Sequence, residues 1–219
     1  MTEAPTIDYQ SAPTPVIKVD LRHMFQRIAG WFAGWETTRR EDIARIAAEI
    51  GGKIPIPLDN DRTFILSARA DRIEHRLDRT YAILDYKTGQ PPTGKQVRMG
   101  LSPQLTLEAA ILREGGFENI PAGSSVSDFG YVRLSGNNPP GEQKPLELKI
   151  KQSGTPQLPD DAADYAREQL EALIRKFEDE AQGYTSLNLS MWSNRYGSYD
   201  DLARIKEWSA AGGLGIEEW

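Results

Sequence analysis

The feature that most constrains the fold is a predicted β-hairpin in the first half of the chain. Two segments rich in strand-forming residues, 63–74 and 80–87, flank a short polar turn centred on Asp78. Because side chains alternate along a strand, Asp85 and Lys87 should lie on the same face of the second strand. A chain with this hairpin is expected to build a β-sheet around it.

The hairpin is predicted to bring two aspartates together. Its turn should place Asp71 of the first strand opposite Asp85 of the second, with Cβ atoms about 5 Å apart. Carboxylates this close repel each other, so such a pair usually has a cation to neutralise it. Oxygen ligands without cysteine favour Mg²⁺ or Mn²⁺. Lys87 would then lie beside the metal, where it can hold a water molecule or a phosphate oxygen.

Both aspartates also have simpler interpretations. Asp85 could be a surface residue near a strand end, although its apolar neighbour Leu84 and the aromatic Tyr86 argue against that. Asp71 could form a salt bridge with Arg69 or Arg72 instead of binding a metal.

Composition excludes several classes of protein. The chain has 219 residues, 39% of them hydrophobic, with a mean hydropathy of -0.54, which is typical of one globular domain with a sizeable core. No apolar run approaches the roughly 20 residues of a membrane span, and no signal peptide is visible, so a cytoplasmic location with no membrane partner is expected. The absence of cysteine excludes disulfides and a thiolate zinc site.

Charge is distributed unevenly along the sequence. The net charge of -6 argues weakly against nucleic acid as a partner. The hairpin and the residues after it are nevertheless locally basic, because residues 62–98 contain four acidic residues and eight basic ones: Arg62, Arg69, Arg72, Arg76, Arg79, Lys87, Lys95 and Arg98. A basic region around an acidic metal site suits a phosphodiester substrate, although Arg76 and Arg79 fit an ordinary solvated turn better.

The order of predicted elements indicates an α/β fold with a central mixed β-sheet flanked by α-helices. A helical pattern starts at Asp20, a possible N-cap, and the apolar residues between 43 and 50 continue it or begin a second helix that ends at Gly51. Further predicted elements are an extended edge at 54–57, the hairpin, a helix capped by Ser102, strands at 126–134 and 146–150, and a helix at 160–182. The predicted domain organisation is a loosely attached lead at 1–19, one domain at 20–185 and an extension at 186–219 packed on it.

These motifs resemble those of the PD-(D/E)xK nuclease superfamily. The segments 68–74 (ARADRIE) and 83–89 (ILDYKTG) are similar to the two core motifs of its RecB-type branch. The segments 95–97, 100–110, 131–136 and 199–209 extend the likeness to the C-terminal nuclease domain of the AddB family in its alphaproteobacterial form. The resemblance covers roughly residues 21–209 and implies a restriction-endonuclease-like core.

The resemblance implies roles for individual residues. Asp71 and Asp85 would bind the metal, with the backbone carbonyl of Tyr86 as a further ligand and Lys87 acting on the attacking water and the phosphate. Glu49 matches the family's upstream acidic ligand, and an exposed glutamate near a helix end is an equally good interpretation. The catalytic set implied is therefore Asp71, Asp85, Lys87 and Glu49.

Substrate contacts are implied for Gln104, Lys95 and Arg98. Gln104 matches a glutamine of the RecB-type branch that could bind a DNA phosphate or the attacking water, and the alternative is an exposed helix residue. Four residues later much of the branch has a tyrosine, whereas this chain has Glu108, which puts a tyrosine contact with DNA in doubt. Lys95 and Arg98 could bind phosphates or simply be solvated.

The function implied is that of a Mg²⁺- or Mn²⁺-dependent DNA exonuclease domain in an AddAB/RecBCD-type helicase-nuclease for double-strand-break repair and recombination. Its expected partners are DNA and an AddA-type helicase-nuclease subunit. The iron–sulfur cluster of other AddB branches is excluded because the chain lacks cysteine. The alternative is a nuclease-fold module that binds DNA or the partner subunit without cutting. Neither His23 nor His75 fits the branch's upstream histidine motif, so the chain resembles either a C-terminal piece of a longer subunit or a compact relative.

Overall fold

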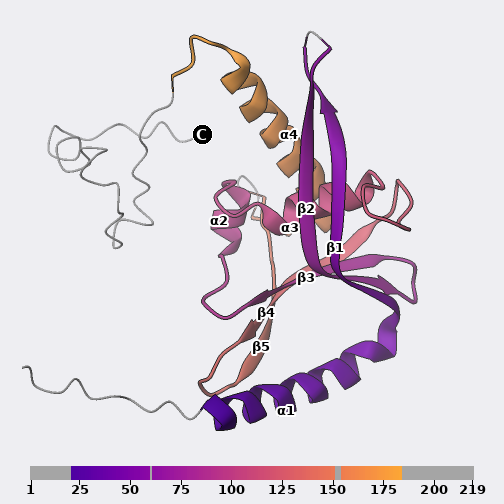
Figure 1. Cartoon of the computed structure of the whole chain (residues 1–219), viewed down its shortest axis with the longest axis vertical. Helices are drawn as coiled ribbons and strands as arrows, with labels where there is room; N and C mark the ends of the chain where they lie inside the picture. Colours follow the sequence, from indigo (N-terminus) through magenta and orange to yellow (C-terminus); the bar gives the residue numbers. More distant parts are fainter. Residues whose placement is uncertain (1–20, 60, 151–153, 184–219) are drawn as a thin grey trace, which may run out of the picture. The chain divides into compact units, whose positions relative to one another are not determined.

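The computed structural model describes residues 21–59, 61–150 and 154–183 (Figure 1). The chain divides into two compact units, residues 1–171 and 172–219, and the whole β-sheet belongs to the first. The predicted lead at 1–19 and the predicted extension at 186–219 lie outside the described residues.

A five-stranded mixed sheet forms the centre of the first unit. Its strands follow one another in chain order: β1 (Ile43–Pro57), β2 (Thr63–Arg76), β3 (Tyr81–Lys87), β4 (Val126–Leu134) and β5 (Gly141–Pro145). All neighbouring pairs are antiparallel except β3 and β4, which are parallel. A parallel pair needs a crossover connection, and the helices α2 (Gly94–Arg98) and α3 (Gln104–Arg113) provide it. The predicted mixed sheet flanked by helices is confirmed.

Strand β2 belongs to two ladders of different length. It pairs with β1 along nearly its whole length, from Thr63 to Arg76, and this long ribbon extends well past the other strands (Figure 1). It pairs with β3 only from His75 to Arg72, where Leu84 is the last partner. Beyond that point β2 leaves β3, so the sheet forks at Asp71.

Helix α3 covers one face of the sheet and closes the hydrophobic core. The apolar residues of this helix are almost all buried, in contact with core residues that point to the same side of the central strands. Prominent members of this core are Ile73, Ile83, Val97, Leu105, Ile111, Leu112, Phe117, Phe129 and Tyr131. Burying a large aliphatic side chain contributes about 1.5–3 kcal/mol, so this layer fixes α3, and with it Gln104, against the end of β3.

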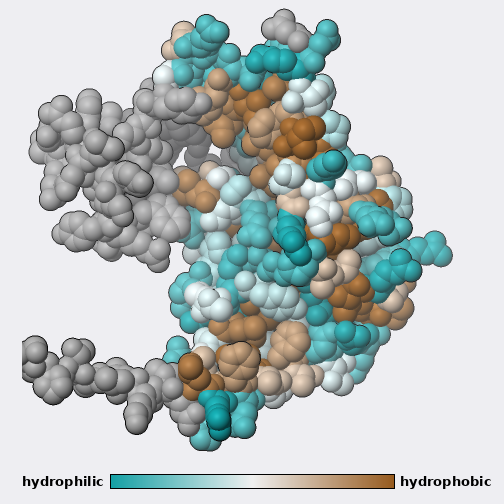
Figure 2. Space-filling view, viewed as in Figure 1, coloured by the Kyte–Doolittle hydropathy of each residue, from teal (hydrophilic) through white to brown (hydrophobic). Residues whose placement is uncertain are grey.

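Helix α1 (Leu21–Arg39) lies on the other side of the sheet and continues into a short 3₁₀ turn at Arg40–Asp42. None of its residues is fully buried, and Phe25 near its start is 70% exposed. Figure 2 shows apolar atoms along the border between α1 and the sheet and hydrophilic atoms on its outer side. Trp31 and Trp35 stack with ring centroids 5.9 Å apart, on this border. Helix α1 is therefore amphipathic and packs on the sheet through its apolar side.

The prediction of a helix between 43 and 50 is wrong, because this segment is the first half of β1. Its apolar residues recur at helical spacing for a structural reason. A register shift between Ile43 and Arg45, and a left-handed backbone at Glu49 (φ 52°), interrupt the alternation of side chains along the strand. Each interruption lengthens the spacing between inward-facing residues, and the pattern then imitates a helix.

Three smaller expectations also need correction. Strand β5 lies at Gly141–Pro145 and not at 146–150. Helix α3 begins at Gln104, with Pro103 at the N-cap position and no side-chain cap from Ser102. Helix α4 (Pro159–Glu178) ends at Glu178 and not at 182, and the residues it buries, Ala162 and Ala163, lie in its first turns. Terminal residues and caps depend on local backbone geometry, which hydrophobic periodicity does not report.

Among the helices in the described part of the chain, none is both long and apolar enough to span a membrane.

Candidate functional site

The two aspartates of the hairpin lie at the fork of the sheet. The register that pairs Arg72 with Leu84 would place Asp71 opposite Asp85 one residue further, where the ladder stops. Where the backbone ladder ends, the side chain of Asp71 bonds to β3 instead: its Oδ2 accepts a hydrogen bond from the backbone N–H of Tyr86 at 2.9 Å. The two acids therefore lie on adjacent antiparallel strands, as the sequence predicts.

Asp85 is almost completely buried, with 2% of its surface exposed. Its Oδ1 accepts a hydrogen bond from Nε2 of Gln104 at 2.8 Å, and its Oδ2 lies 2.5 Å from Nζ of Lys87. Burial raises the pKa of the Asp85 carboxyl, and the negative charge of Asp71 raises it further, while Lys87 and Gln104 oppose the rise. Among the described residues, the carboxylates of Asp71 and Asp85 therefore lie near one ion-pairing ammonium group, that of Lys87.

Glu108 is the site residue that sequence reasoning missed. It follows Gln104 by one helical turn on α3 and accepts a hydrogen bond from Gln104 Nε2 at 3.2 Å. Only 1% of the residue is exposed, and its Oε2 is buried without a hydrogen-bond partner among the described residues. Burial raises the pKa of Glu108 to about 7, and the charges of Asp85 and Asp71 add to the rise. The sequence signal was present, because Glu108 occupies the position where the resemblance predicts tyrosine.

A tyrosine borders the site from another direction. Tyr131 of β4 is the parallel partner of Asp85 on β3, and its hydroxyl is buried. Burial raises the pKa of Tyr131, and the carboxylates of Asp85 and Glu108 raise it further. The phenol therefore stays neutral and can act as a hydrogen-bond donor beside the acids. Its sequence segment matched the family, but nothing in the sequence linked Tyr131 to the site.

The backbone of Glu49 lies near the site, but its carboxylate has its ion-pair partner outside the site. Its neighbours Ala48 and Ile50 pair with Arg72 and Ala70, so its backbone lies across from Asp71 on the β1–β2 ladder. Its side chain is 64% exposed, and its carboxylate forms an ion pair with Arg69 at 2.9 Å. The structure therefore brings the backbone of Glu49 next to the site while its carboxylate bonds to an arginine. Its role as a metal ligand stays a prediction.

The remaining predicted residues fall into two groups. Gln104 is in the site, but its amide bonds to Lys87, Asp85 and Glu108. Lys95 and Arg98 lie on the short helix α2; Lys95 is exposed and Arg98 half-buried, and neither forms an ion pair within the described residues. They stay available for an anionic substrate.

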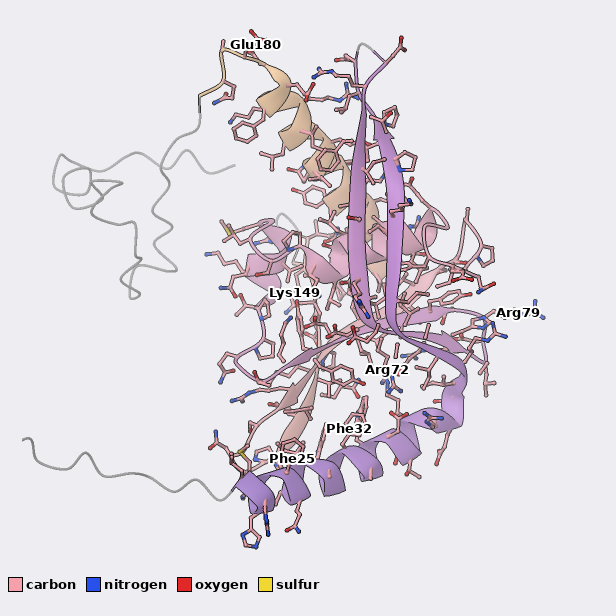
Figure 3. All side chains as sticks on the ribbon, viewed as in Figure 1. Phe25, Phe32, Arg72, Arg79, Lys149 and Glu180 are labelled. Carbon is pink, nitrogen blue, oxygen red and sulfur yellow. The ribbon has the colours of Figure 1, made fainter. Side chains whose placement is uncertain are left out.

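On the opposite face of the sheet, beneath α1, lies a second charged cluster. It consists of three arginines and three acids: Arg39, Arg72, Arg76, Glu36, Glu74 and Asp128. Arg72 points from β2 towards α1, and Phe32 points back from α1 (Figure 3). The fully buried Glu74 is held by Arg39 at 2.8 Å and by Arg72 at 2.7 Å. We call this group the paired cluster.

The paired cluster changes the interpretation of the basic region. Arg72 and Arg76 were counted among the residues that could attract a phosphodiester, but both form ion pairs beneath α1, with Glu36, Glu74 and Asp128. The side chains of Asp71 and Arg72 are neighbours in sequence and point to opposite faces, because a strand alternates. Charge counted along the sequence therefore overstates the positive charge available near Asp85.

The donors at the fork fit a hard divalent cation. They are carboxylate oxygens, which Mg²⁺ and Mn²⁺ prefer, and the negative charge of Asp71 disfavours the charged form of Asp85. In residues 21–59, 61–150 and 154–183, no three acidic or histidine side chains converge closely enough to form a ready metal site. The arrangement thus provides two carboxylates and a buried third acid, Glu108, held behind them by Gln104.

Comparison with known proteins identifies the family. The model of the PD-(D/E)XK nuclease superfamily matches residues 2–196, which is most of the chain. The protein belongs to this superfamily.

Its relatives and structural likenesses add little about function. The chain is 38% identical over 132 residues to an uncharacterized protein of Rickettsia bellii, matching 55% of this chain and 16% of that protein. An uncharacterized protein of Rickettsia typhi is 39% identical over 95 residues, which are 43% of this chain and 11% of that protein. The chain therefore spans only a small part of the length of these relatives. The crystal structure of SSO0001 aligns over 70% of this chain and 65% of that one, with 11% identity and a TM-score of 0.37, which is too low to support an argument.

Proposed function

We propose that the protein is a metal-dependent DNA exonuclease domain that hydrolyses phosphodiester bonds at the fork between β2 and β3. The observation that supports this most directly is the group of Asp71, Asp85 and Lys87, in which two acids lie on adjacent strands and a lysine ammonium group pairs with Asp85. Membership of the PD-(D/E)XK superfamily supports a nuclease activity in general. The assignment to DNA and to Mg²⁺ or Mn²⁺ is part of the proposal.

In this proposal Asp71 and Asp85 hold the cation, with the Tyr86 carbonyl and Glu49 as further candidate ligands. A bound Mg²⁺ would supply positive charge against the phosphate oxygens on which negative charge develops. Glu49 can reach the site only if its carboxylate leaves Arg69, its ion-pair partner.

Lys87 is proposed to change partners during the reaction. Without a metal its ammonium group neutralises Asp85 at 2.5 Å. With a cation held by Asp71 and Asp85, Lys87 would be free to donate hydrogen bonds to the attacking water and to a phosphate oxygen, where they would stabilise the charge of the transition state. The side chain is partly exposed, so it lies where a substrate can reach it. Lys95 and Arg98 are proposed to bind neighbouring phosphates.

The biological setting we propose is double-strand-break repair and recombination, as part of an AddAB/RecBCD-type helicase-nuclease with an AddA-type partner subunit, in the cytoplasm. This rests on the resemblance of the motif segments to AddB. That the curated relatives are several times longer than the matched region is consistent with a domain of a larger protein.

A second candidate function is a nuclease-fold module that binds DNA or the helicase subunit without cutting. The observation that favours it is that no three acidic or histidine side chains in the described residues converge as a metal site. The complete set of Asp71, Asp85 and Lys87 favours the enzyme.

The test is digestion of single- and double-stranded DNA by the purified chain with Mg²⁺ or Mn²⁺. We expect Lys87→Ala to lower the rate of cleavage by at least about 10²–10³-fold, the usual loss when a group that stabilises transition-state charge is removed. Binding of Mn²⁺ and of DNA should change little, because the lysine does not bind the cation. Lys144→Ala, which removes a lysine paired with Glu142 on β5, is the matched control.

Unchanged cutting by Lys87→Ala would place the active site elsewhere. If the wild-type chain does not cut with any divalent metal, the assay is repeated with the AddA-type subunit. Cutting in that mixture would support an enzyme that needs its partner, and DNA binding without cutting would support the second candidate.

A further inference from the structure

Three charged side chains determine the orientation of the Gln104 amide. Its Nε2 donates to Asp85 Oδ1 at 2.8 Å and to Glu108 Oε1 at 3.2 Å, and its Oε1 accepts from Lys87 Nζ at 3.2 Å. An amide nitrogen has two hydrogens to donate, and both are used here. Rotating the amide by half a turn would place its oxygen against two carboxylates and its NH₂ group against an ammonium. With Lys87, Asp85 and Glu108 all charged, each of the three contacts would then be repulsive.

Burying the carboxylate of Glu108 is energetically unfavourable, and the packing of α3 does not require a carboxylate at this position. A buried carboxylate with one unpartnered oxygen is unfavourable, and an apolar residue or a glutamine at this position on α3 would avoid that cost. The pKa of Glu108, raised by burial to about 7, reflects the same unfavourable environment. Its contact with Gln104 is the one side-chain hydrogen bond it forms among the described residues. The presence of glutamate here is therefore explained better by what it does to Gln104 than by stability.

We propose that Glu108 is a positioning residue of the nuclease site: it fixes the orientation of Gln104, which holds Asp85 by one oxygen and tethers Lys87. The inference rests on the proposed function and deepens it. With Gln104 fixed, Oδ1 of Asp85 stays hydrogen-bonded to the amide, and a cation held by Asp85 would replace Lys87 as the partner of this carboxylate. After that exchange, Lys87 keeps Gln104 Oε1 as a partner and stays beside the substrate.

Without Glu108 the amide loses one of the contacts that exclude the flipped state. A glutamine at position 108 could accept from Gln104 or donate to it, so both orientations would be populated. In the flipped state the amide oxygen faces Asp85 and the NH₂ group faces Lys87. The amide then no longer donates to Asp85 or accepts from Lys87, so neither side chain is held in its position. We therefore expect Glu108→Gln to lower kcat, with little change in KM for DNA, because the chemistry is affected and not the phosphate contacts.

The test is a double-mutant cycle on the cleavage rate, with Glu108→Gln, Gln104→Ala and the double variant. If Glu108 acts through Gln104, the glutamine substitution should lower kcat about 10- to 100-fold in the wild-type background and less than about 2-fold in the Gln104→Ala background. Mn²⁺ affinity, measured by electron paramagnetic resonance, should stay within about 2-fold. Glu118→Gln, an exposed glutamate in the loop after α3, is the matched control.

Three outcomes would overturn the inference. Additive losses in the cycle would mean that Glu108 does not act through Gln104. A tenfold or greater loss of Mn²⁺ affinity would make Glu108 a ligand and not a positioning residue. A Glu108→Gln variant that unfolds would make the residue structural, and Glu108→Leu then separates loss of charge from loss of packing by its melting temperature.

A readout that does not need cleavage keeps this test separate from that of the proposed function. If the wild-type chain never cuts, the side-chain amide protons of Gln104 are followed by nuclear magnetic resonance. One pair of shifted resonances in the wild type that moves or broadens in Glu108→Gln, and not in Glu118→Gln, supports the positioning role. Unchanged resonances contradict it.

Discussion

The two faces of the sheet at β2 carry charged clusters that differ in their balance of positive and negative charge. Beneath α1, three arginines meet three acids, and the fully buried Glu74 is bonded to two guanidinium groups. On the α3 side, the acids Asp71, Asp85 and Glu108 meet one ion-pairing lysine among the described residues. Buried charges of opposite sign offset part of the cost of removing each other from water, whereas buried charges of one sign add repulsion to that cost. The charges of the first cluster are therefore matched within the fold, and the second cluster is the one at which we propose that a cation binds.

The comparison predicts that the paired cluster matters most for stability. Glu74→Gln should lower the free energy of unfolding by about 3–5 kcal/mol, because it leaves Arg39 and Arg72 buried without their shared carboxylate. Chemical denaturation measures the loss. The folded fraction should still bind Mn²⁺ as the wild type does. A loss of metal binding at full folding would show that the two clusters are coupled through β2.

We call Asp71, Asp85, Glu108 and Lys87 the acid-rich cluster, and we expect a bound metal to stabilise this cluster and not the paired one. At a Mg²⁺ concentration 100 times the dissociation constant, the wild type should gain about 2.7 kcal/mol in unfolding free energy. Asp85→Asn should lose this gain and, in EDTA, should be no less stable than the wild type, since it removes a buried charge. Differential scanning calorimetry with and without Mg²⁺ gives both values.

The same measurement on two further variants sharpens the result. Glu74→Gln should keep the stabilisation by Mg²⁺, and a loss there would contradict the separation of the clusters. Glu49→Gln tests the predicted upstream ligand: a reduced gain would make Glu49 a ligand that leaves Arg69 when metal binds, and an unchanged gain would leave it as an exposed ion pair.

The smallest predicted effect is on pH dependence. The pKa of Glu108 is raised to about 7 in the folded protein, from an ordinary value of 4.5. The folded state therefore binds more protons than the unfolded state between these values, and the stability contributed at low pH is lost as pH rises through 7. In EDTA the wild type should lose on the order of 2 kcal/mol relative to Glu108→Gln across this range. Denaturation curves that stay parallel for the two proteins from pH 4.5 to 8 would contradict the raised pKa.

The sequence predicted the part of the site that depends on local register. Alternation and turn length are enough to place Asp71 beside Asp85, and Lys87 on the same face as Asp85, because all three lie on one hairpin. The mixed sheet also followed from the order of elements. Glu108 was not predicted as a site residue, although its replacement of the expected tyrosine was visible, because the packing that sets this face of α3 against the end of β3 is not specified by periodicity.

Other features escaped prediction because they depend on distant parts of the chain. The strand at 43–50 is interrupted at Glu49, and only its pairing with β2 shows that it is not a helix. The arginines of the hairpin were counted in a locally basic region, yet Arg72 bonds to Glu36, which lies 36 residues earlier. Such pairings are set by how α1 packs, and no short sequence pattern encodes them.

The fork in the sheet also bears on how the molecule folds. The residues of the acid-rich cluster all come from one stretch of 38 positions, from Asp71 to Glu108, on β2, β3 and α3. The paired cluster and its neighbours instead join α1 to β5, as in the hydrogen bond from Trp35 to Gln143, 108 residues apart. Short loops close sooner and at lower entropic cost than long ones. The hairpin and α3 can therefore assemble the reactive groups early, and the closing of α1 over the opposite face is left as the late step of folding.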